Sequence, residues 1–439
     1  MAVGTIGIIC LIIFFILLFM GFPVAFCMIV IGWGGVAAIV GFPQSFAVIS
    51  GDIYTQFSSY TMTVVPLFAL MGYLAHSSGL GDKLFDTAYK FIGHWPGGLA
   101  IATDAACAGF GAICGSIPAT VATMSSIAYP QMKRYGYKDQ LSAGIIAAAS
   151  GLSVLIPPSV TLIIFGIATE TSVGRLFAAG IGPGVALAVF MAIAIIIIVK
   201  RNPSLAPKSD AVPWKDRFSA LLHGGVLEII VVFLVSIGGL FLGFFTPTEG
   251  GAVGAVGMLI VCLIQRTLKW KDFIESLSAS VKLSAMVMVL LAGASIFSRM
   301  FALSRIPNSL GNWVESLVLP DWAIMTVIIF IYLILGLIME EFAAVIITIP
   351  IFFPIVTQTL GYGAEWFCVV MVIVMLMGAL SPPIGMNVFY TIGAIKNLRL
   401  QDVFRGVIPF LICELILALI MVFFPSLATF IPDLIYGVG

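Results

Sequence analysis

The sequence predicts an all-α polytopic membrane protein made of two inverted-topology repeats, each with a re-entrant hairpin and a broken transmembrane helix. The chain has 439 residues, of which 61% are hydrophobic and 9% are charged, whereas soluble domains are about 25% charged. Two charge-free stretches, Gln140–Thr169 and Trp366–Ile395, are each interrupted near the middle by a Pro-Pro pair. Loops at matching positions of the two halves differ in their content of Lys and Arg.

The two interrupted stretches predict broken membrane helices. Each has 30 residues, and a continuous helix of that length would run ~45 Å, against a hydrocarbon core of roughly 30 Å. Proline removes an amide donor and clashes with the preceding turn, so we expect breaks at Pro157-Pro158 and Pro382-Pro383. Lipid cannot satisfy unwound backbone, so protein or a water-filled cavity must surround each break. Transporters place their binding sites at such positions.

An internal repeat follows from pairs of motifs at a nearly constant offset. Tyr129-Pro130 recurs as Phe353-Pro354, and Gly136-Tyr137 recurs as Gly361-Tyr362 at almost the same distance along the chain. The two Pro-Pro pairs share this offset, and several pairs at one offset indicate duplicated structural units. We expect a first repeat at 1–200, a linker at 201–223 and a second repeat at 224–439.

Loop charges predict that the two repeats are inverted. Lys and Arg favour the cytoplasmic side in short loops. The loop Gln131–Asp139 has three basic residues, whereas its partner, Ile355–Glu365, has none. The loop Gly41–Asp52 has none, whereas its partner carries Arg266, Lys269 and Lys271. Matching loops therefore fall on opposite sides of the membrane, as in inverted repeats. The basic linker is expected to be cytoplasmic.

The threading that follows has ten crossings and two re-entrant hairpins. Both termini are expected to be periplasmic, and the first apolar run is interpreted as a retained helix rather than a removed signal. The hairpins are at 97–130 and 321–354, and the broken helices at 140–169 and 366–395. The expected spans are Val3–Met20, Val24–Val40, Ile53–Ala75, Gln140–Thr169 and Leu176–Val199, then Gly224–Phe244, Thr248–Ile264, Leu283–Phe301, Trp366–Ile395 and Val407–Phe424.

The hairpin tips carry the most unusual residues of the predicted membrane region. The first tip is a run of glycine, serine and proline around Gly115 and Ser116, which are poor residues for a helix interior. The second tip contains Glu340 and Glu341. Acidic residues at the bilayer centre cost ~2.5–3.5 kcal/mol each on insertion scales. They need a cavity, a partner or a cation; the alternative is a solvent-exposed tip or a helix N-terminus that they cap.

The breaks and tips together predict a site for Na⁺ and substrate. Na⁺ favours oxygen ligands, which unwound carbonyls and side chains of Ser, Thr and Asn supply. Half-helix N-termini after the breaks would offer amide donors to an anion. For each hydroxyl, back-bonding to a helix carbonyl is the alternative role. The candidates are Gly115, Ser116, Thr120, Ser153, Pro157, Pro158, Ser159, Glu340, Glu341, Thr348, Ser381, Pro382, Pro383 and Asn387, with Na⁺ expected near Ser116, Ser153, Ser381 and Asn387.

Other motifs do not point to an enzyme. Gly79-Leu80-Gly81-Asp82 matches one motif of intramembrane aspartyl proteases, but that chemistry needs two carboxylates sharing a proton and no second motif appears. The glycines of Gly250–Gly257 have the spacing of close helix packing. The seven scattered cysteines are interpreted as small core residues. No Walker motif is present, so the energy must come from an ion gradient or a partner. No cofactor is expected besides Na⁺ as coupling ion.

The motifs resemble one known family. They are GAICGSIPATVATMSSIAYPQMKRYGY (111–137), SGLSVLIPPSVTLIIFG (150–166), FTPTEGGAV (245–253) and GALSPPIGMNVF (378–389). They are similar, nearly end to end, to the large membrane subunit of tripartite ATP-independent periplasmic (TRAP) transporters, particularly the sialic acid members. The breaks alone are shared with the wider ion transporter superfamily.

The resemblance implies Na⁺-driven uptake of an organic acid, such as sialic acid or a C4-dicarboxylate, across a bacterial inner membrane. It implies two partners besides the lipid bilayer, a small four-helix membrane subunit and a periplasmic substrate-binding protein, and no nucleic acid. It also implies an elevator-type motion of the hairpins and broken helices against a scaffold. The alternative is a stand-alone anion/Na⁺ symporter of the ion transporter superfamily that needs no binding protein.

The sequence departs from the family pattern at two places. Gly250 and Gly251 stand where the family often has alanines, and Glu340 stands where it often has aspartate. Glu249 is expected either to act in transport or to stabilise the turn between two spans. Glu414, alone in the last span, is expected to face the small subunit.

Overall fold

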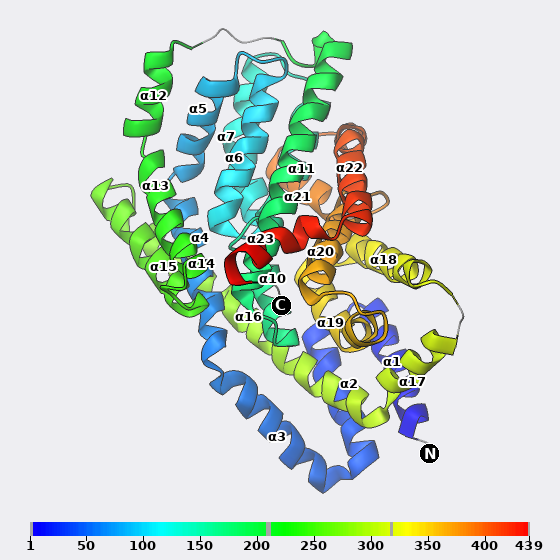
Figure 1. Ribbon diagram of the computed structural model, residues 1–439. Coiled ribbons are helices and arrows are strands. Elements are labelled where there is room, and N and C mark those ends of the chain that lie inside the picture. The colour runs from blue at the N-terminus through cyan, green and yellow to red at the C-terminus, as the bar shows by residue number, and fades with distance from the viewer. Residues whose placement is uncertain (1–2, 208–211, 317–318, 438–439) are drawn as a thin grey trace.

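The computed structural model describes residues 3–207, 212–316 and 319–437, and these ranges are helical without a β-strand. This confirms the predicted all-α class. Figure 1 shows many of the helices side by side in the upper part of the molecule, while α3 extends away from them at the lower end.

The first half contains eleven α-helices within its described residues. A short 3₁₀ turn at Tyr60–Thr63 separates the third from the fourth, and another at Pro203–Leu205 follows the last. The helices are α1 (Val3–Phe19), α2 (Val24–Val40), α3 (Phe42–Ser58), α4 (Val64–Ser77), α5 (Leu80–Ile92), α6 (Gly98–Cys114), α7 (Ile117–Arg134), α8 (Asp139–Ala149), α9 (Leu152–Leu155), α10 (Val160–Thr169) and α11 (Val173–Arg201).

The remainder of the chain is built in the same way. Two π turns, Leu234–Gly238 and Ile355–Thr359, continue neighbouring helices. The helices are α12 (Trp214–His223), α13 (Val226–Phe233), α14 (Gly239–Phe241), α15 (Pro247–Ile264), α16 (Trp270–Ser304), α17 (Ile306–Ser316), α18 (Asp321–Ile338), α19 (Glu341–Pro354), α20 (Ala364–Leu380), α21 (Met386–Ala394), α22 (Leu400–Phe423) and α23 (Ser426–Tyr436).

The helix order of the first half recurs in the second at a nearly constant spacing. The start of α7 corresponds to the start of α19, and the start of α8 to that of α20, at almost the offset of the sequence motifs. The pair α3 and α4, bent by 51° at its joint, has the unbroken 35-residue α16 as its counterpart.

One expectation was wrong here, because the predicted loop 41–52 is largely helix. Pro43 stands at the start of α3, where proline is well tolerated. The ring of Trp33 also packs on Phe42 and Phe46 of this helix. Packing against α2 therefore supports a helix in this segment.

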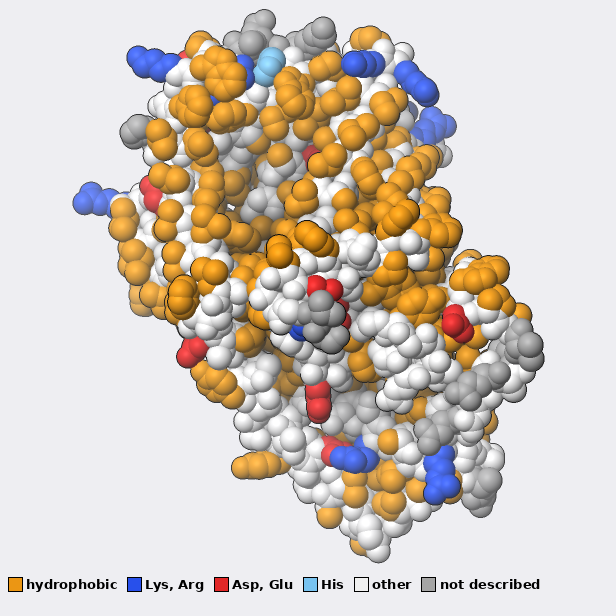
Figure 2. Space-filling view, viewed as in Figure 1, with side chains coloured by type: hydrophobic (Ala, Val, Ile, Leu, Met, Phe, Trp, Pro, Cys, Tyr) orange, Lys and Arg blue, Asp and Glu red, His pale blue; other side chains and the backbone are white. Residues whose placement is uncertain are grey.

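Seven helices of the described residues are long and apolar enough to cross a membrane, or up to nine when each of two bent pairs counts as one span. Helices α1 and α2 have 17 residues each. The seven include α18 and α19 with its π turn, so length and composition do not distinguish a re-entrant hairpin from two crossings. Figure 2 shows hydrophobic side chains over most of one face and several Lys and Arg side chains along its upper edge.

The predicted linker 201–223 is partly helical. Residues 208–211 lie outside the described part of the chain, but α12 begins at Trp214 and packs against α5. Arg217 of α12 is buried, and its guanidinium lies 4.6 Å from the centre of the Trp214 ring.

Three sequence interpretations concern residues outside the candidate site. Thr246 and Glu249 form a capping box at the start of α15, with Glu249 Oε2 accepting from Thr246 N at 2.8 Å, so Glu249 stabilises this turn. Gly254 packs against α4, because a Cβ placed on it would lie 2.5 Å from Met71 Sδ. All seven cysteines are free and buried, which confirms that they are core residues.

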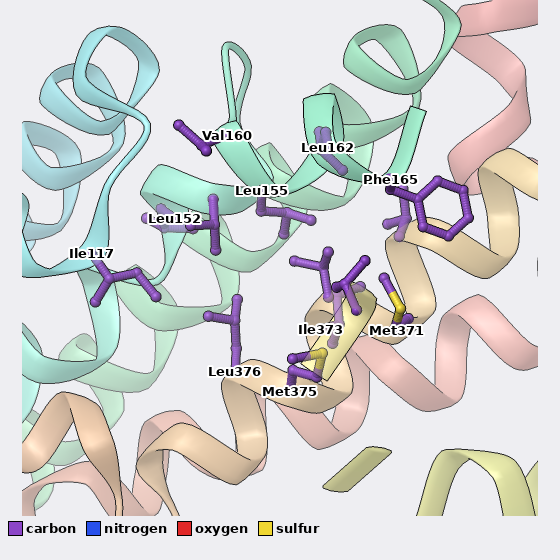
Figure 3. Close-up of a cluster of buried hydrophobic side chains, with 14 of the residues drawn as sticks. Ile117, Leu152, Leu155, Val160, Leu162, Phe165, Met371, Ile373, Met375 and Leu376 are labelled. Atoms are coloured by element: carbon purple, nitrogen blue, oxygen red, sulfur yellow. The ribbon is translucent and has the colours of Figure 1, made fainter. Parts of the chain in front are cut away.

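The core joins the two halves. Helices α9 and α10 pack against α20, and Figure 3 shows Leu155 and Phe165 facing Met371 and Leu376. Between apolar helices in a membrane, close contact of small residues replaces the hydrophobic driving force. Gly144 of α8 and Gly406 of α22 make such a contact, since a Cβ on Gly144 would lie 2.5 Å from the Gly406 carbonyl carbon.

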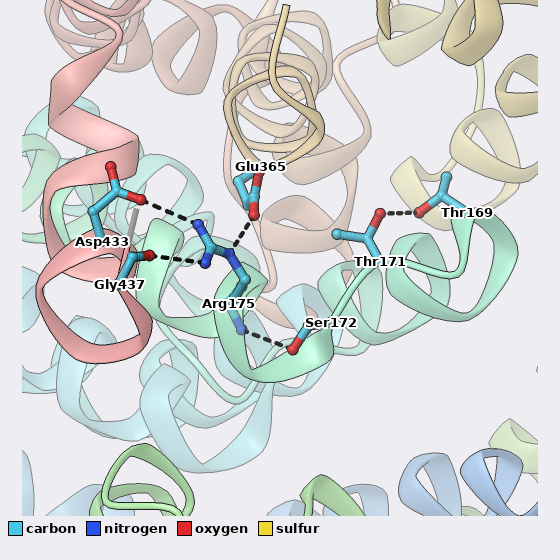
Figure 4. Close-up of polar contacts among 7 residues, drawn as sticks. All are labelled: Thr169, Thr171, Ser172, Arg175, Glu365, Asp433 and Gly437. Atoms are coloured by element: carbon cyan, nitrogen blue, oxygen red, sulfur yellow. Dashed lines mark hydrogen bonds and ion pairs between the residues drawn. The ribbon is translucent and has the colours of Figure 1, made fainter. Parts of the chain in front are cut away.

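Arg175 ties three segments together at one end of α11. Its Nε donates to Glu365 Oε1 at 2.6 Å, and its Nη2 donates to Asp433 Oδ1 at 3.1 Å. Its Nη1 also donates to the Gly437 carbonyl at 3.2 Å. Figure 4 shows these contacts of Arg175 with the start of α20 and with the C-terminal segment. Arg175 thus holds the first half to the second.

Candidate functional site

The first tip is a two-residue connection, Gly115-Ser116, and its first position favours glycine. Helix α6 ends at Cys114, Gly115 is left-handed with φ 61°, and Ser116 is extended before α7 begins. A side chain at a positive φ is strained. A Cβ on Gly115 would also lie 2.6 Å from the Pro158 carbonyl oxygen. The first tip therefore lies directly on the first proline break.

The first break is enclosed by the protein. Helix α9 ends at Leu155, and α10 begins at Val160, where Ser159 Oγ accepts from Leu162 N at 3.3 Å. Pro157 and Pro158, joined by a cis peptide bond, are both buried, as is Ser159.

Glycines bring the enclosing helices close to this break. A Cβ on Gly111 of α6 would lie 2.6 Å from Ser153 Cα. One on Gly180 of α11 would lie 2.2 Å from the Leu155 carbonyl oxygen. The backbone on both sides of the break therefore lies against other helices.

The second tip has the same plan with different residues. Helix α18 ends at Ile338, and Glu340 is extended immediately before α19 begins at Glu341. Gly336 is the counterpart of Gly111 at the offset of the Pro-Pro pairs, and Gly378 of α20 is the counterpart of Ser153. A Cβ on Gly378 would lie 2.7 Å from the Gly336 backbone. Both tips therefore rest on a broken helix through equivalent positions.

The second break is exposed where the first is buried. Helix α20 ends at Leu380, and Gly385, with φ 66°, precedes α21. Pro382 and Pro383, also joined by a cis peptide bond, are exposed in this chain. Asn387 in the first turn of α21 is 2% exposed, and its Nδ2 has no hydrogen-bond partner among the described residues.

Each half-helix after a break packs against the hairpin of the other half. Helix α10 packs on α19, and α21 packs on α7. Within the second half, Tyr390 of α21 donates a 2.6 Å hydrogen bond to Glu340 Oε1. The exchange brings the start of α10 close to the second tip.

Both tips meet at one cavity of about 400 Å³. One wall comes from the tips and the start of α10, and the other from α4 and α16. The lining residues are Tyr73, His76, Gly115, Ser116, Pro118, Ala119, Val160, Thr161, Leu283, Met286, Glu340, Glu341 and Phe342.

Four of the predicted site residues line this cavity: Gly115, Ser116, Glu340 and Glu341. The other hydroxyls donate to nearby backbone carbonyls. Thr120 bonds to Ser116, Ser153 to Ser150, Thr348 to Ala344 and Ser381 to Met377, at 2.7–2.9 Å. Such bonds leave the oxygen lone pairs available to a cation. Residues Ser381, Pro382, Pro383 and Asn387 do not line the cavity, nor do Pro157, Pro158 and Ser159, which lie behind the first tip.

The sequence reasoning missed several lining residues. His76 Nδ1 is 2.6 Å from Thr123 Oγ1, which fixes the imidazole beside the first hairpin. Thr161 is fully buried, and its Oγ1 has no partner among the described residues. The one available signal was position, because Thr161 is the second residue of the half-helix after the first break. Tyr73 and His76 gave no signal, since they lie in an unbroken apolar run of α4.

Interrupted apolar helices around a cavity that contains two carboxylates are typical of the class of helical membrane transport proteins. A sequence model of the family described as "Tripartite ATP-independent periplasmic transporter, DctM component" matches residues 11–427. The chain belongs to this family of large membrane subunits.

Characterised relatives support the assignment. The chain is 35% identical to the C4-dicarboxylate TRAP transporter large permease protein DctM of Pseudomonas aeruginosa, over 92% of this chain and 93% of the relative. It is 30% identical to the ectoine TRAP transporter large permease protein TeaC of Halomonas elongata, over 96% and 97%. It is 28% identical to the sialic acid TRAP transporter large permease protein SiaM of Vibrio cholerae, over 96% and 97%. The chain is thus similar to a sialic acid relative, and it is at least as similar to relatives named for C4-dicarboxylates and ectoine.

A solved structure shares the fold. The Alcanivorax borkumensis YdaH transporter superimposes with a TM-score of 0.61 over 88% of this chain and 90% of that chain, at 14% sequence identity. At this identity the likeness concerns the fold alone.

Proposed function

We propose that this chain is the permease subunit of a Na⁺-coupled tripartite transporter that imports an organic acid across a bacterial inner membrane. A periplasmic binding protein delivers the substrate, and a small four-helix membrane subunit completes the transporter. The proposal rests on the cavity between the two tips. This cavity lies where the hairpins and broken helices meet α4 and α16.

An elevator motion accounts for this location. The hairpins and broken helices, α6–α10 and α18–α21, pack on one another through the core described above. The opposite cavity wall comes from Tyr73 and His76 of α4 and from Leu283 and Met286 of α16. Sliding of the first group along α4 and α16 would expose the same tips to either side of the membrane, which is how such transporters alternate access.

The contacts of the two tips support a structural repeat. The contact of Gly111 with Ser153 and that of Gly336 with Gly378 join equivalent positions of the two repeats. The exchanged packing of α10 on α19 and of α21 on α7 relates the halves in the same way. We propose that these like units face opposite ways, as the loop charges predict, with both termini in the periplasm.

Na⁺ would move together with the substrate, and the tips and breaks supply oxygens suited to it. No group of three or more His, Cys, Asp or Glu side chains suited to a metal ion occurs in the described ranges. Ligands for Na⁺ would then be the carbonyls of the unwound segments and hydroxyls such as Ser116 and Ser153. We expect Ser153→Ala and Ser381→Ala to weaken the Na⁺ dependence of uptake.

Reconstitution tests the proposal. The chain is placed in proteoliposomes with or without the small subunit and the loaded binding protein, under an inward Na⁺ gradient or without one. Three solutes are offered: succinate as a C4-dicarboxylate, sialic acid and ectoine. Uptake that needs both partners and the gradient is expected. Uptake by this chain alone would instead establish the stand-alone symporter.

A further inference from the structure

The charges that line the cavity are unusual for a protein that binds an anion. Among the described lining residues, the formal charges come from Glu340 and Glu341, and no Lys or Arg is present. None of the ion pairs among the described residues involves either glutamate. Tyr390 donates one hydrogen bond to Glu340 but carries no positive charge. The second tip therefore presents two carboxylates that lack a cationic partner in the described part of the chain.

The first tip and the start of α10 have the opposite character. The helix starts at Ile117 and Val160 lie in the same cavity region as Ser116 and Thr161. The first N–H groups of a helix have no intrahelical acceptor and form the positive end of its dipole. Thr161 Oγ1 is fully buried without a partner among the described residues, so a ligand atom would satisfy it. This wall suits a carboxylate.

A ligand with one carboxylate and one cation would match both walls. A dianion would satisfy the helix starts but would bring its second charge towards two carboxylates, and like charges at close range repel. On the basis of the proposed transport function, we infer that the substrate is a carboxylate that also bears an ammonium or amidinium group, with the cation on Glu340 and Glu341. The carboxylate lies at the starts of α7 and α10.

The competing explanation is that the two glutamates hold Na⁺. A bound Na⁺ would neutralise one charge and permit an anionic substrate. The two explanations differ in what the glutamates control: the choice among substrates, or the dependence on Na⁺.

Ligand binding to the full-length chain in lipid nanodiscs separates them. The melting temperature is followed against the concentration of ectoine, a zwitterion, and of succinate, a dianion, in Na⁺ and in choline buffer. The variants are Glu340→Gln, Glu341→Gln and Glu341→Asp, with Glu275→Gln as control, since Glu275 is an exposed residue of α16. Glu341→Asp keeps the charge if the glutamine variant fails to fold.

We expect the unmodified chain and Glu275→Gln to bind ectoine at least tenfold more tightly than succinate. Losing a charge-assisted contact weakens binding by roughly 10- to 100-fold, so each glutamine variant should lose most of this preference, while Glu341→Asp keeps part of it. Succinate binding as tight as ectoine binding would overturn the inference and leave the transport function intact. Glutamine variants that keep the preference but lose the effect of Na⁺ would also overturn it. Absence of ectoine binding in both buffers would overturn the inference as well, whereas the transport function is tested separately by the reconstitution described above.

Discussion

The Tyr390 hydroxyl donates a 2.6 Å hydrogen bond to Oε1 of Glu340. Tyr390 lies in the helix after the second proline break, whereas Glu340 lies at the second hairpin tip. A distance this short is typical of a hydroxyl bonded to an ionised carboxylate, the stronger kind of hydrogen bond. Although the second break does not line the cavity, its half-helix thus fixes one of the two cavity carboxylates.

Tyr390→Phe should loosen the second tip. Removal of the hydroxyl leaves a carboxylate oxygen without its donor, and hydrogen bonds to charged groups contribute about 1.5–3 kcal/mol. We expect backbone amides at 339–343 to exchange with deuterium roughly tenfold faster or more, as measured by mass spectrometry. Tyr135→Phe is the control, because it removes an exposed hydroxyl bonded to Tyr89 at 3.0 Å. Equal exchange at the tip in both variants would show that the bond does not hold it.

Gly115→Ala should damage the protein more than a matched glycine substitution. Gly115 and Gly361 both have positive φ, 61° and 72°. Forcing an alanine into this conformation costs about 1–2 kcal/mol at either site. At Gly361 the new methyl meets open space, whereas at Gly115 it meets the Pro158 carbonyl oxygen at 2.6 Å.

Melting temperatures and uptake measure the difference. We expect Gly361→Ala to melt slightly below the unmodified chain and to transport normally. Gly115→Ala should melt several degrees lower still and lose most uptake, because the first tip must move off the break. Similar melting temperatures for the two variants would contradict the close contact.

The sequence identifies the breaks and tips because their chemistry is local. Proline cannot continue a helix, and Gly115 is the residue that a left-handed turn requires, so both are visible in the chain itself. Side-chain direction is not local. Tyr73 and His76 of α4 line the cavity, and no motif in the sequence marks them.

The asymmetry of the two breaks was also beyond sequence reasoning. Pro157-Pro158 and Pro382-Pro383 stand at equivalent places, and both were expected at one site. Pro158 is covered by Gly115, whereas Pro382 and Pro383 are exposed. Burial depends on how the helices of the whole chain pack in one state of the transporter, which two identical motifs cannot encode.

Arg175 should contribute more to stability than a surface cation. It contacts Glu365, Asp433 and the Gly437 carbonyl while only 21% exposed. Arg175→Met leaves those carboxylates unpaired, and we expect a loss of about 1–3 kcal/mol in the free energy of unfolding. Lys271→Met, which removes an exposed pair at 3.8 Å, should change stability by less than about 0.5 kcal/mol. Equal effects in a denaturant series would refute the role of Arg175.

The buried carboxyl group of Glu414 should lower the stability of the fold. It was expected to face the small subunit, and this was wrong, because the side chain is 0% exposed within this chain. Neither carboxyl oxygen has a partner among the described residues, and an unpartnered buried polar group costs roughly 1–3 kcal/mol. Glu414→Met keeps a similar volume, so we expect a higher melting temperature. A lower one would show that the carboxyl group stabilises the fold through a hydrogen-bond partner that the substitution removes.

Labelling of single cysteines tests the predicted inversion. Gln131 and Gly363 are exposed, and they lie in the equivalent segments before the two broken helices. The basic loop beside Gln131 should be cytoplasmic, and the loop of Gly363, which lacks Lys and Arg, periplasmic. A membrane-impermeant maleimide added to intact cells should therefore label Gly363→Cys and not Gln131→Cys, and permeabilised cells should show both. The native cysteines are buried and give a low background. Labelling of both variants in intact cells would show that the two loops face the same side of the membrane. The two halves would then be parallel, and the inverted symmetry that the proposed elevator motion needs would be absent.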